Sequence, residues 1–154
     1  MPARRHDRAG RARSLSRRLA MQALYQWQMT GQSFAELRHQ FATEEEYADV
    51  DPEYFVAMLQ GVMDQMAALD ARLGELIDRP VGQLDPVEHA VLLLGMHELE
   101  HRLDVPYRVV INESVELAKK FGATEGHKFI NAVLDRAART LRATEQAAAR
   151  KSRD

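Results

Sequence analysis

Two apolar stripes in the segment 106–136 constrain the fold of this chain more than any other feature of its sequence. On either side of Gly122, apolar residues recur at spacings of three and four. Because this spacing places them on one face of a helix, each half of the segment predicts an amphipathic helix. We expect Pro106 at the first helical position and Gly122 in the left-handed conformation that ends a helix. Thr124 is expected to cap the second helix.

The other periodic segments also predict helices. A first helix is expected from about Ser14 to Thr30, and the capping box formed by Ser33 and Glu36 opens a short one. The longest periodic run begins at Asp51-Pro52 and ends at Pro80. No stretch shows the period-two alternation of a half-buried strand. We therefore expect an all-α protein of six or seven helices.

Length and composition predict a small protein and are compatible with a reducing cytoplasm. At 154 residues, the chain suits one domain or two small subdomains. It contains no cysteine, no apolar run of the roughly 20 residues needed to span a membrane, and no secretory signal. A disordered basic arm is expected at 1–13, helical segments at 14–80 and 81–142, and a flexible tail at 143–154.

Charge is segregated along the chain although the formal net charge is only −2. Residues 1–18 contain seven arginines against the single Asp7. Residues 36–53 contain seven acidic residues against the single Arg38. The basic segment suggests contact with a polyanion, although a solvated tail would have the same composition. The acidic segment is expected to be a solvated loop, and no partner for it follows from the sequence.

Polar residues set into the two stripes resemble a family signature. The motifs Asn112-Glu113, Glu116–Gly122 and His127–Asn131 resemble the C-terminal signature of the NusB family, the bacterial transcription antitermination factors. Arg17 and the run 20–25 resemble a second motif of that family. The resemblance implies two small helical bundles packed together. It also implies a bacterial RNA-binding protein that pairs with the ribosomal protein NusE on boxA RNA and helps RNA polymerase pass terminators in ribosomal RNA operons.

The resemblance also implies which residues contact RNA, and each of them has a structural alternative. Arginines pair with phosphates, and aromatic rings stack on unpaired bases. Phe129 would equally suit the core, and Glu88 would equally suit the positive end of a helix dipole. The residues implied for RNA contact are Arg11, Arg13, Arg17, Tyr25, Glu88, Glu125, Lys128 and Phe129.

Other functions compete with RNA binding by a free-standing factor. NusB-like domains also occur fused to ribosomal RNA cytosine methyltransferases, so the chain would suit the binding domain of such an enzyme. The pattern His97-Glu98-x-x-His101 matches a zinc peptidase motif. Because no third ligand follows at a suitable spacing, we expect solvated histidines on a helix surface, with no metal, no cofactor and no catalysis. A monomer and a homodimer both suit the sequence.

Overall fold

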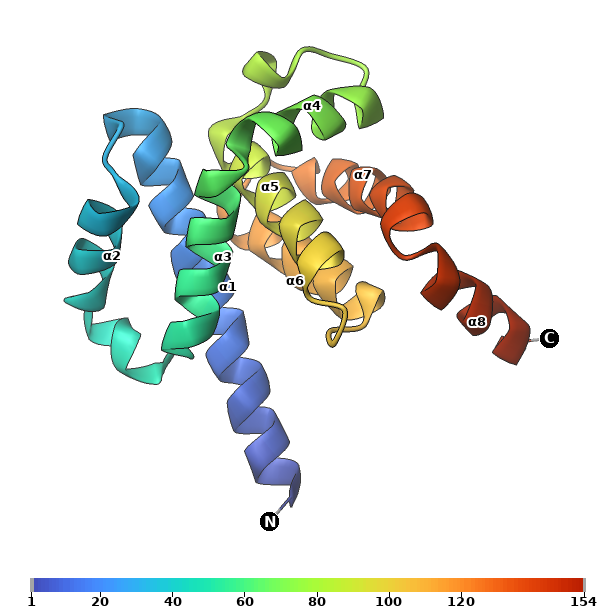
Figure 1. Cartoon of the computed structure of the whole chain (residues 1–154), viewed down its shortest axis with the longest axis horizontal. Coiled ribbons are helices and arrows are strands. Elements are labelled where there is room, and N and C mark those ends of the chain that lie inside the picture. Colours follow the sequence, from blue (N-terminus) through green and yellow to red (C-terminus); the bar gives the residue numbers. More distant parts are fainter. Residues whose placement is uncertain (1, 154) are drawn as a thin grey trace. The chain divides into compact units, whose positions relative to one another are not determined.

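The computed structural model describes residues 2–153, with side chains from Asp7 to Ser152, and divides the chain into two compact units. Unit 1 is Met1–Gln65 and unit 2 is Met66–Asp154. Every regular element among the described residues is helical, with eight α-helices and two short 3-10 helices (Figure 1). The predicted all-α class is confirmed, and the predicted count of six or seven helices is corrected to eight. No described helix is both long and apolar enough to cross a membrane.

Unit 1 is built on its first helix. Its elements are α1 (Pro2–Thr30), α2 (Phe34–Ala42), η1 (Glu45–Asp49) and α3 (Pro52–Asp64). Gly31 ends α1 with a φ of 72°, a conformation that glycine adopts without steric cost. The predicted capping box then starts α2, because the Ser33 side chain accepts from the Glu36 N–H while the Glu36 side chain accepts from Ser33 N–H.

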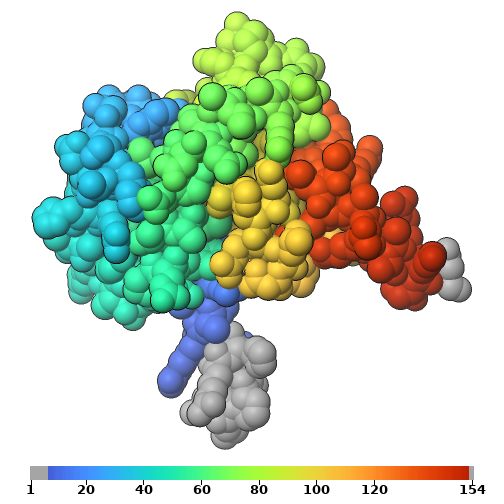
Figure 2. Space-filling model, viewed as in Figure 1, coloured from blue at the N-terminus to red at the C-terminus, as the bar shows by residue number. Residues whose placement is uncertain are grey.

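The interior of unit 1 lies between α1, α2 and α3. Phe55 is fully buried, and its ring lies 6.3 Å from that of Phe41 and 5.6 Å from that of Tyr47. Ser16 ties α1 to the start of α3, since its Oγ donates to the Asp51 carbonyl and accepts from the Asp51 N–H, both at 3.0 Å. In the space-filling view, α2, η1 and α3 form most of the visible face of this unit (Figure 2).

Unit 2 surrounds a central helix. Its elements are α4 (Met66–Leu76), η2 (Val81–Gln83), α5 (Pro86–His101), α6 (Tyr107–Phe121), α7 (Gly126–Leu141) and α8 (Ala143–Arg153). Every residue of α5 from Ala90 to Leu99 is buried, including the polar His97 and Glu98. At Gly95 an added Cβ would lie 2.8 Å from Leu134 and 3.1 Å from the Ser114 hydroxyl, so this glycine lets α6 and α7 approach α5 closely.

A buried arginine closes the C-terminal end of α5. The Arg142 guanidinium donates to the carbonyls of Leu99 at 2.6 Å, Val105 at 2.9 Å and Arg102 at 2.8 Å. It also pairs with Glu145 at 2.6 Å, and only 3% of its surface is exposed. These carbonyls have no partner within a helix, so one side chain from the α7–α8 junction satisfies them.

The segment boundaries differ from the sequence prediction at three places. The long run after Asp51 breaks at Gln65, whose φ of −122° and ψ of 24° leave the helix, so the units divide there and not at residue 80. Helix α1 includes the expected disordered arm, because arginine and alanine favour a helix that already continues into a packed segment. The expected flexible tail likewise contains α8, which is rich in alanine.

Candidate nucleic-acid interface

The arginines of α1 lie on two sides of the helix. Arg11 is exposed, Arg13 and Arg18 are half-buried, and Arg17 is only 5% exposed. Arg11, Arg18 and Tyr25 follow one another at intervals of seven residues, so they share one face with a drift of about 20° per interval. Arg13 and Arg17 lie on the other side of the helix.

The inner pair of arginines packs on a tyrosine of α3. The guanidinium carbons of Arg13 and Arg17 lie 4.5 Å and 5.3 Å from the centroid of the Tyr54 ring. Arg17 also donates to the Tyr54 hydroxyl at 3.4 Å. Cation–π contacts of this kind fix the side chains. Arg17 therefore holds α1 against α3, and of the three predicted RNA-contacting arginines only Arg11 is fully open to solvent.

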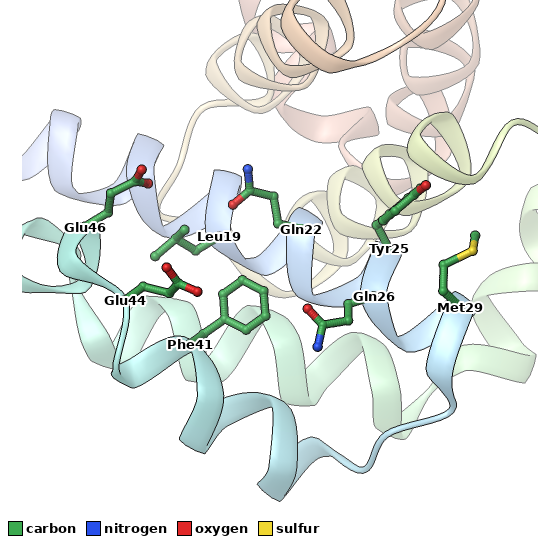
Figure 3. Close-up of a pocket in the computed structure, with 8 residues that line it drawn as sticks. All are labelled: Leu19, Gln22, Tyr25, Gln26, Met29, Phe41, Glu44 and Glu46. Carbon is green, nitrogen blue, oxygen red and sulfur yellow. The ribbon is translucent and has the colours of Figure 1, made fainter.

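Tyr25 is open to a ligand. It is 41% exposed and comes 14 residues after Arg11, which corresponds to about 21 Å along the helix axis. Its ring lies beside Met29 at one end of a groove between α1 and α2 (Figure 3). The structure therefore spaces Arg11 and Tyr25 along one face of a straight helix, at a separation that several nucleotides of a single strand would span.

In unit 2, the turn between α6 and α7 differs from its prediction in detail. Gly122 is extended, with a φ of −90° and a ψ of −179°, and it is not left-handed. The left-handed residue is Glu125, with a φ of 70°, and it occupies the N-cap position predicted for Thr124. Helix α7 begins one residue later than predicted. The chain therefore reverses its direction at Glu125 and not at Gly122. Lys128 Nζ lies 2.6 Å from the Glu125 carboxylate.

Phe129 lies at the edge of the core, with an arginine over its ring. Its side chain is half-buried. The Arg79 guanidinium carbon lies 4.6 Å from the ring centroid, a distance typical of a cation–π contact. Arg79 comes from the loop between α4 and η2, and sequence reasoning did not single it out. No periodicity or motif marks this residue, because its position depends on how that loop passes α7.

Glu88 is brought against the same turn. Asp85 caps α5 by accepting from the N–H groups of Val87 and Glu88, so Glu88 lies in the first turn. Its side chain is 9% exposed. Burial raises its pKa, and the nearby Asp85 adds to this effect while Arg79 opposes it. An added Cβ at Gly126 would lie 2.2 Å from the Glu88 carboxylate, so glycine lets this carboxylate approach the start of α7 closely.

Unit 2 therefore gathers four predicted residues and one unpredicted residue into a single cluster. Glu88, Glu125, Lys128 and Phe129 meet around Gly126, and Arg79 covers the ring. The cluster combines an aromatic face, two cations and two carboxylates, which together suit a phosphate, a stacked base and a base amino group.

The histidine pair of the zinc-like motif is not the solvated surface feature predicted from the sequence. His97 is 7% exposed and Glu98 1% exposed, whereas His101 is exposed. Burial, followed by the neighbouring His101, lowers the pKa of His97 to about 4. The two rings pack against each other with centroids 4.6 Å apart. Within the described chain, no three His, Cys, Asp or Glu side chains are grouped to hold a metal ion.

Comparison with known proteins identifies close relatives of the chain. The model of the NusB family matches residues 14–139. The transcription antitermination protein NusB of Idiomarina loihiensis is 49% identical over 135 residues, which cover 88% of this chain and 97% of that protein. The protein of the same name from Hahella chejuensis is 47% identical over 144 residues, covering 94% and 97%.

Solved structures agree with these sequence relatives. The structure of T. maritima NusB aligns with a TM-score of 0.74 at 25% identity, covering 83% of this chain and 91% of that one. A chain from the crystal structure of the antitermination factors NusB and NusE in complex with double-stranded RNA aligns with a TM-score of 0.68, also at 25% identity. That alignment covers 82% of this chain and 96% of the other.

Proposed function

Since this chain belongs to the NusB family, we propose that it is a transcription antitermination factor that binds boxA RNA together with NusE. It would act in the bacterial cytoplasm on the RNA of ribosomal operons as RNA polymerase transcribes them. The observation that carries the RNA-binding role is the cluster around Gly126. It brings residues from α5 and α7 to one place and presents an aromatic face beside two cations.

The predicted residues take different roles in this proposal. Arg11 and Arg13 in unit 1, and Lys128 in unit 2, contact phosphates and supply the salt-sensitive part of the affinity. Tyr25 and Phe129 stack on bases, while Glu88 and Glu125 accept from base amino groups. Arg17 positions α1 through Tyr54 and adds to its positive potential. Arg79 joins the site by covering one side of the Phe129 ring.

We also propose that the protein works by binding and not by catalysis. The support is the nearly full-length match to relatives named as antitermination proteins, since the alignments cover 97% of two of them. A gel shift of a boxA oligonucleotide, with and without purified NusE, tests the whole function. We expect weak binding by the protein alone and tighter binding with NusE. Equal binding of boxA and a scrambled oligonucleotide would contradict the function.

The arginine contacts are tested by salt dependence. Replacing Arg11 with Gln should lower the slope of log affinity against log salt by about 0.7 for the one lost contact to a single strand. Arg139→Gln, which changes an exposed arginine on α7 paired with Asp135, is the matched control and should leave the slope unchanged. If both variants keep the slope of the parent protein, Arg11 does not contact phosphate.

The stacking role of Phe129 is tested by two substitutions at the same position. Phe129→Leu keeps an apolar side chain but removes the aromatic face, so RNA affinity should fall by a factor of about ten with little change in melting temperature. Phe129→Tyr should retain the affinity. A large drop in melting temperature for Phe129→Leu, with no selective loss of RNA binding, would instead place Phe129 in the core only.

A further inference from the structure

A second surface of unit 1 has the properties of a binding groove. It lies between α1 and the segment formed by α2 and η1, and it encloses about 400 Å³ (Figure 3). We call it the α1–α2 groove. Its lining residues are Leu19, Gln22, Tyr25, Gln26, Met29, Phe41, Glu44 and Glu46.

The groove is fixed at both ends by contacts between its two walls. Toward the end of α1, the Gln26 amide donates to the Gln40 side chain at 2.7 Å. Toward the start of α1, Arg18 lies 3.6 Å from the Glu46 carboxylate. Because both walls are held in this way, the groove is formed before a ligand arrives, and binding does not require the walls to be ordered first.

The groove exposes large apolar side chains, whereas elsewhere in unit 1 such side chains are covered. Among the described side chains of this unit, the exposed large hydrophobic ones are Tyr25 at 41% and Met29 at 56%, and both line the groove. Leu19 and Phe41 form a buried apolar floor. A methionine at such a site adapts its shape to different side chains. An apolar floor with an exposed aromatic and methionine suits an apolar anchor residue.

The acidic residues at the rim of the groove favour a positively charged ligand. Glu44 and Glu46 are exposed, and Glu45 lies between them in the chain. The Glu44 carboxylate makes no ion pair or hydrogen bond within the described part of the chain. These carboxylates would repel a phosphate backbone and attract a lysine or arginine. The acidic segment noted in the sequence is exposed as expected, and it also borders an apolar site.

We infer that the α1–α2 groove binds a segment of a protein partner in which an apolar side chain lies next to a lysine or arginine. The apolar side chain enters between Met29 and Phe41, and the cation lies over Glu44 and Glu46. The side-chain amide of Gln22 forms no hydrogen bond within the described residues, so it is available to the backbone of the segment. Tyr25 is shared with the proposed RNA surface, but the acidic rim of the groove differs in charge from the arginine end of α1, and the inference does not depend on RNA binding.

The test uses the full chain with its methionine methyl groups labelled for NMR. The probes are a short synthetic peptide of leucine and lysine and a matched peptide of leucine and glutamate. The lysine peptide should shift the Met29 methyl signal saturably and leave the buried Met58 unchanged, while the glutamate peptide should shift neither. Glu44→Lys combined with Glu46→Lys should weaken the lysine peptide by a factor of about ten.

A matched control separates the groove from overall charge. Glu53→Lys combined with Asp64→Lys makes the same change in net charge on α3, and neither residue lines the groove. This variant should bind the lysine peptide like the parent protein. The inference is overturned if both double variants lose affinity equally or if the glutamate peptide binds as well. It is also overturned if a higher protein concentration alone shifts Met29 as strongly as the lysine peptide.

Discussion

The interiors of the two units differ in the polar groups that they bury. Among the described side chains, unit 1 buries two polar or charged residues, Ser16 and Arg17. Unit 2 buries six. These are Glu88, His97, Glu98, Ser114, Arg142 and Gln146. Unit 1 is therefore stabilised mainly by apolar packing, whereas unit 2 also depends on partners for its buried polar groups.

Because of this difference, the two units should respond differently to substitution and to pH. Apolar packing is lost by volume changes and does not depend on protonation. A buried titratable group makes stability depend on pH whenever folding changes its pKa. Trp27, the single tryptophan of the chain, lies on α1, so its fluorescence reports on the unfolding of unit 1.

The largest effect is expected in the apolar interior of unit 1. Phe55→Ala should lower the free energy of unfolding by about 3–5 kcal/mol, because it removes a fully buried ring that packs on Phe41 and Tyr47. The loss should be the same at acidic and neutral pH. Denaturant titrations followed by Trp27 fluorescence measure it. A loss that changed strongly with pH would remove the contrast between the units.

Arg142→Met should lower the stability of unit 2 by about 3 kcal/mol. The substitution keeps a long apolar stem but leaves the carbonyls of Leu99 and Val105 without their donor, while the Arg102 carbonyl keeps the Val105 N–H. Urea unfolding followed by far-UV circular dichroism measures the loss. Arg139→Met, on the exposed side of α7, is the control and should change stability little. If the two variants behaved alike, the buried arginine would not hold the end of α5.

The stability of unit 2 should fall as the pH is lowered from about 6.5 to about 4, because His97 binds a proton more readily in the unfolded chain than in the fold. Its folded pKa is below the unfolded value, so its contribution is complete above pH 6.5 and is lost toward pH 4. The loss should amount to at most about 3 kcal/mol. His97→Gln should flatten the profile, whereas His39→Gln in unit 1 should leave it unchanged.

The smallest effect is expected at Glu88. Because burial raises its pKa, its charged form destabilises the fold at neutral pH, and this cost disappears as the pH falls through the folded pKa toward 4.5. Glu88→Gln should therefore stabilise the protein slightly at neutral pH and have no effect in acid. Thermal unfolding at several pH values measures it. A loss of stability at neutral pH would mean that the helix dipole favours the charge more than burial opposes it.

The sequence predicted the features that depend on local pattern. The starts of α2, α3 and α5 follow from capping residues and prolines, and the burial of α5 follows from its apolar composition. The gathering of Glu88, Glu125, Lys128 and Phe129 was expected only from the family resemblance. Periodicity alone carries no information about which polar residues of separate helices meet.

The features that were missed depend on tertiary contacts. Arg79 and Arg142 are ordinary arginines in sequence, and each acquires its role from a ring or from carbonyls that lie far along the chain. His97 was expected at the surface because no third zinc ligand follows at a suitable spacing, but the fold buries its side chain. The left-handed residue was placed at Gly122 because glycine adopts that conformation at no cost, yet the chain reverses at Glu125.

The position of Arg142 has a consequence for the order in which a ribosome can complete this fold. All the helices of unit 1 have been synthesised once Gln65 has left the ribosome, so this unit can form early in translation. Unit 2 cannot close in the same way, because the carbonyl of Leu99 waits for a donor that is synthesised 43 residues later. For that interval the C-terminal end of α5 carries unsatisfied carbonyls beside an apolar helix. While the residues from Leu99 to Arg142 are being synthesised, the nascent chain should therefore depend most on chaperones or on rapid elongation.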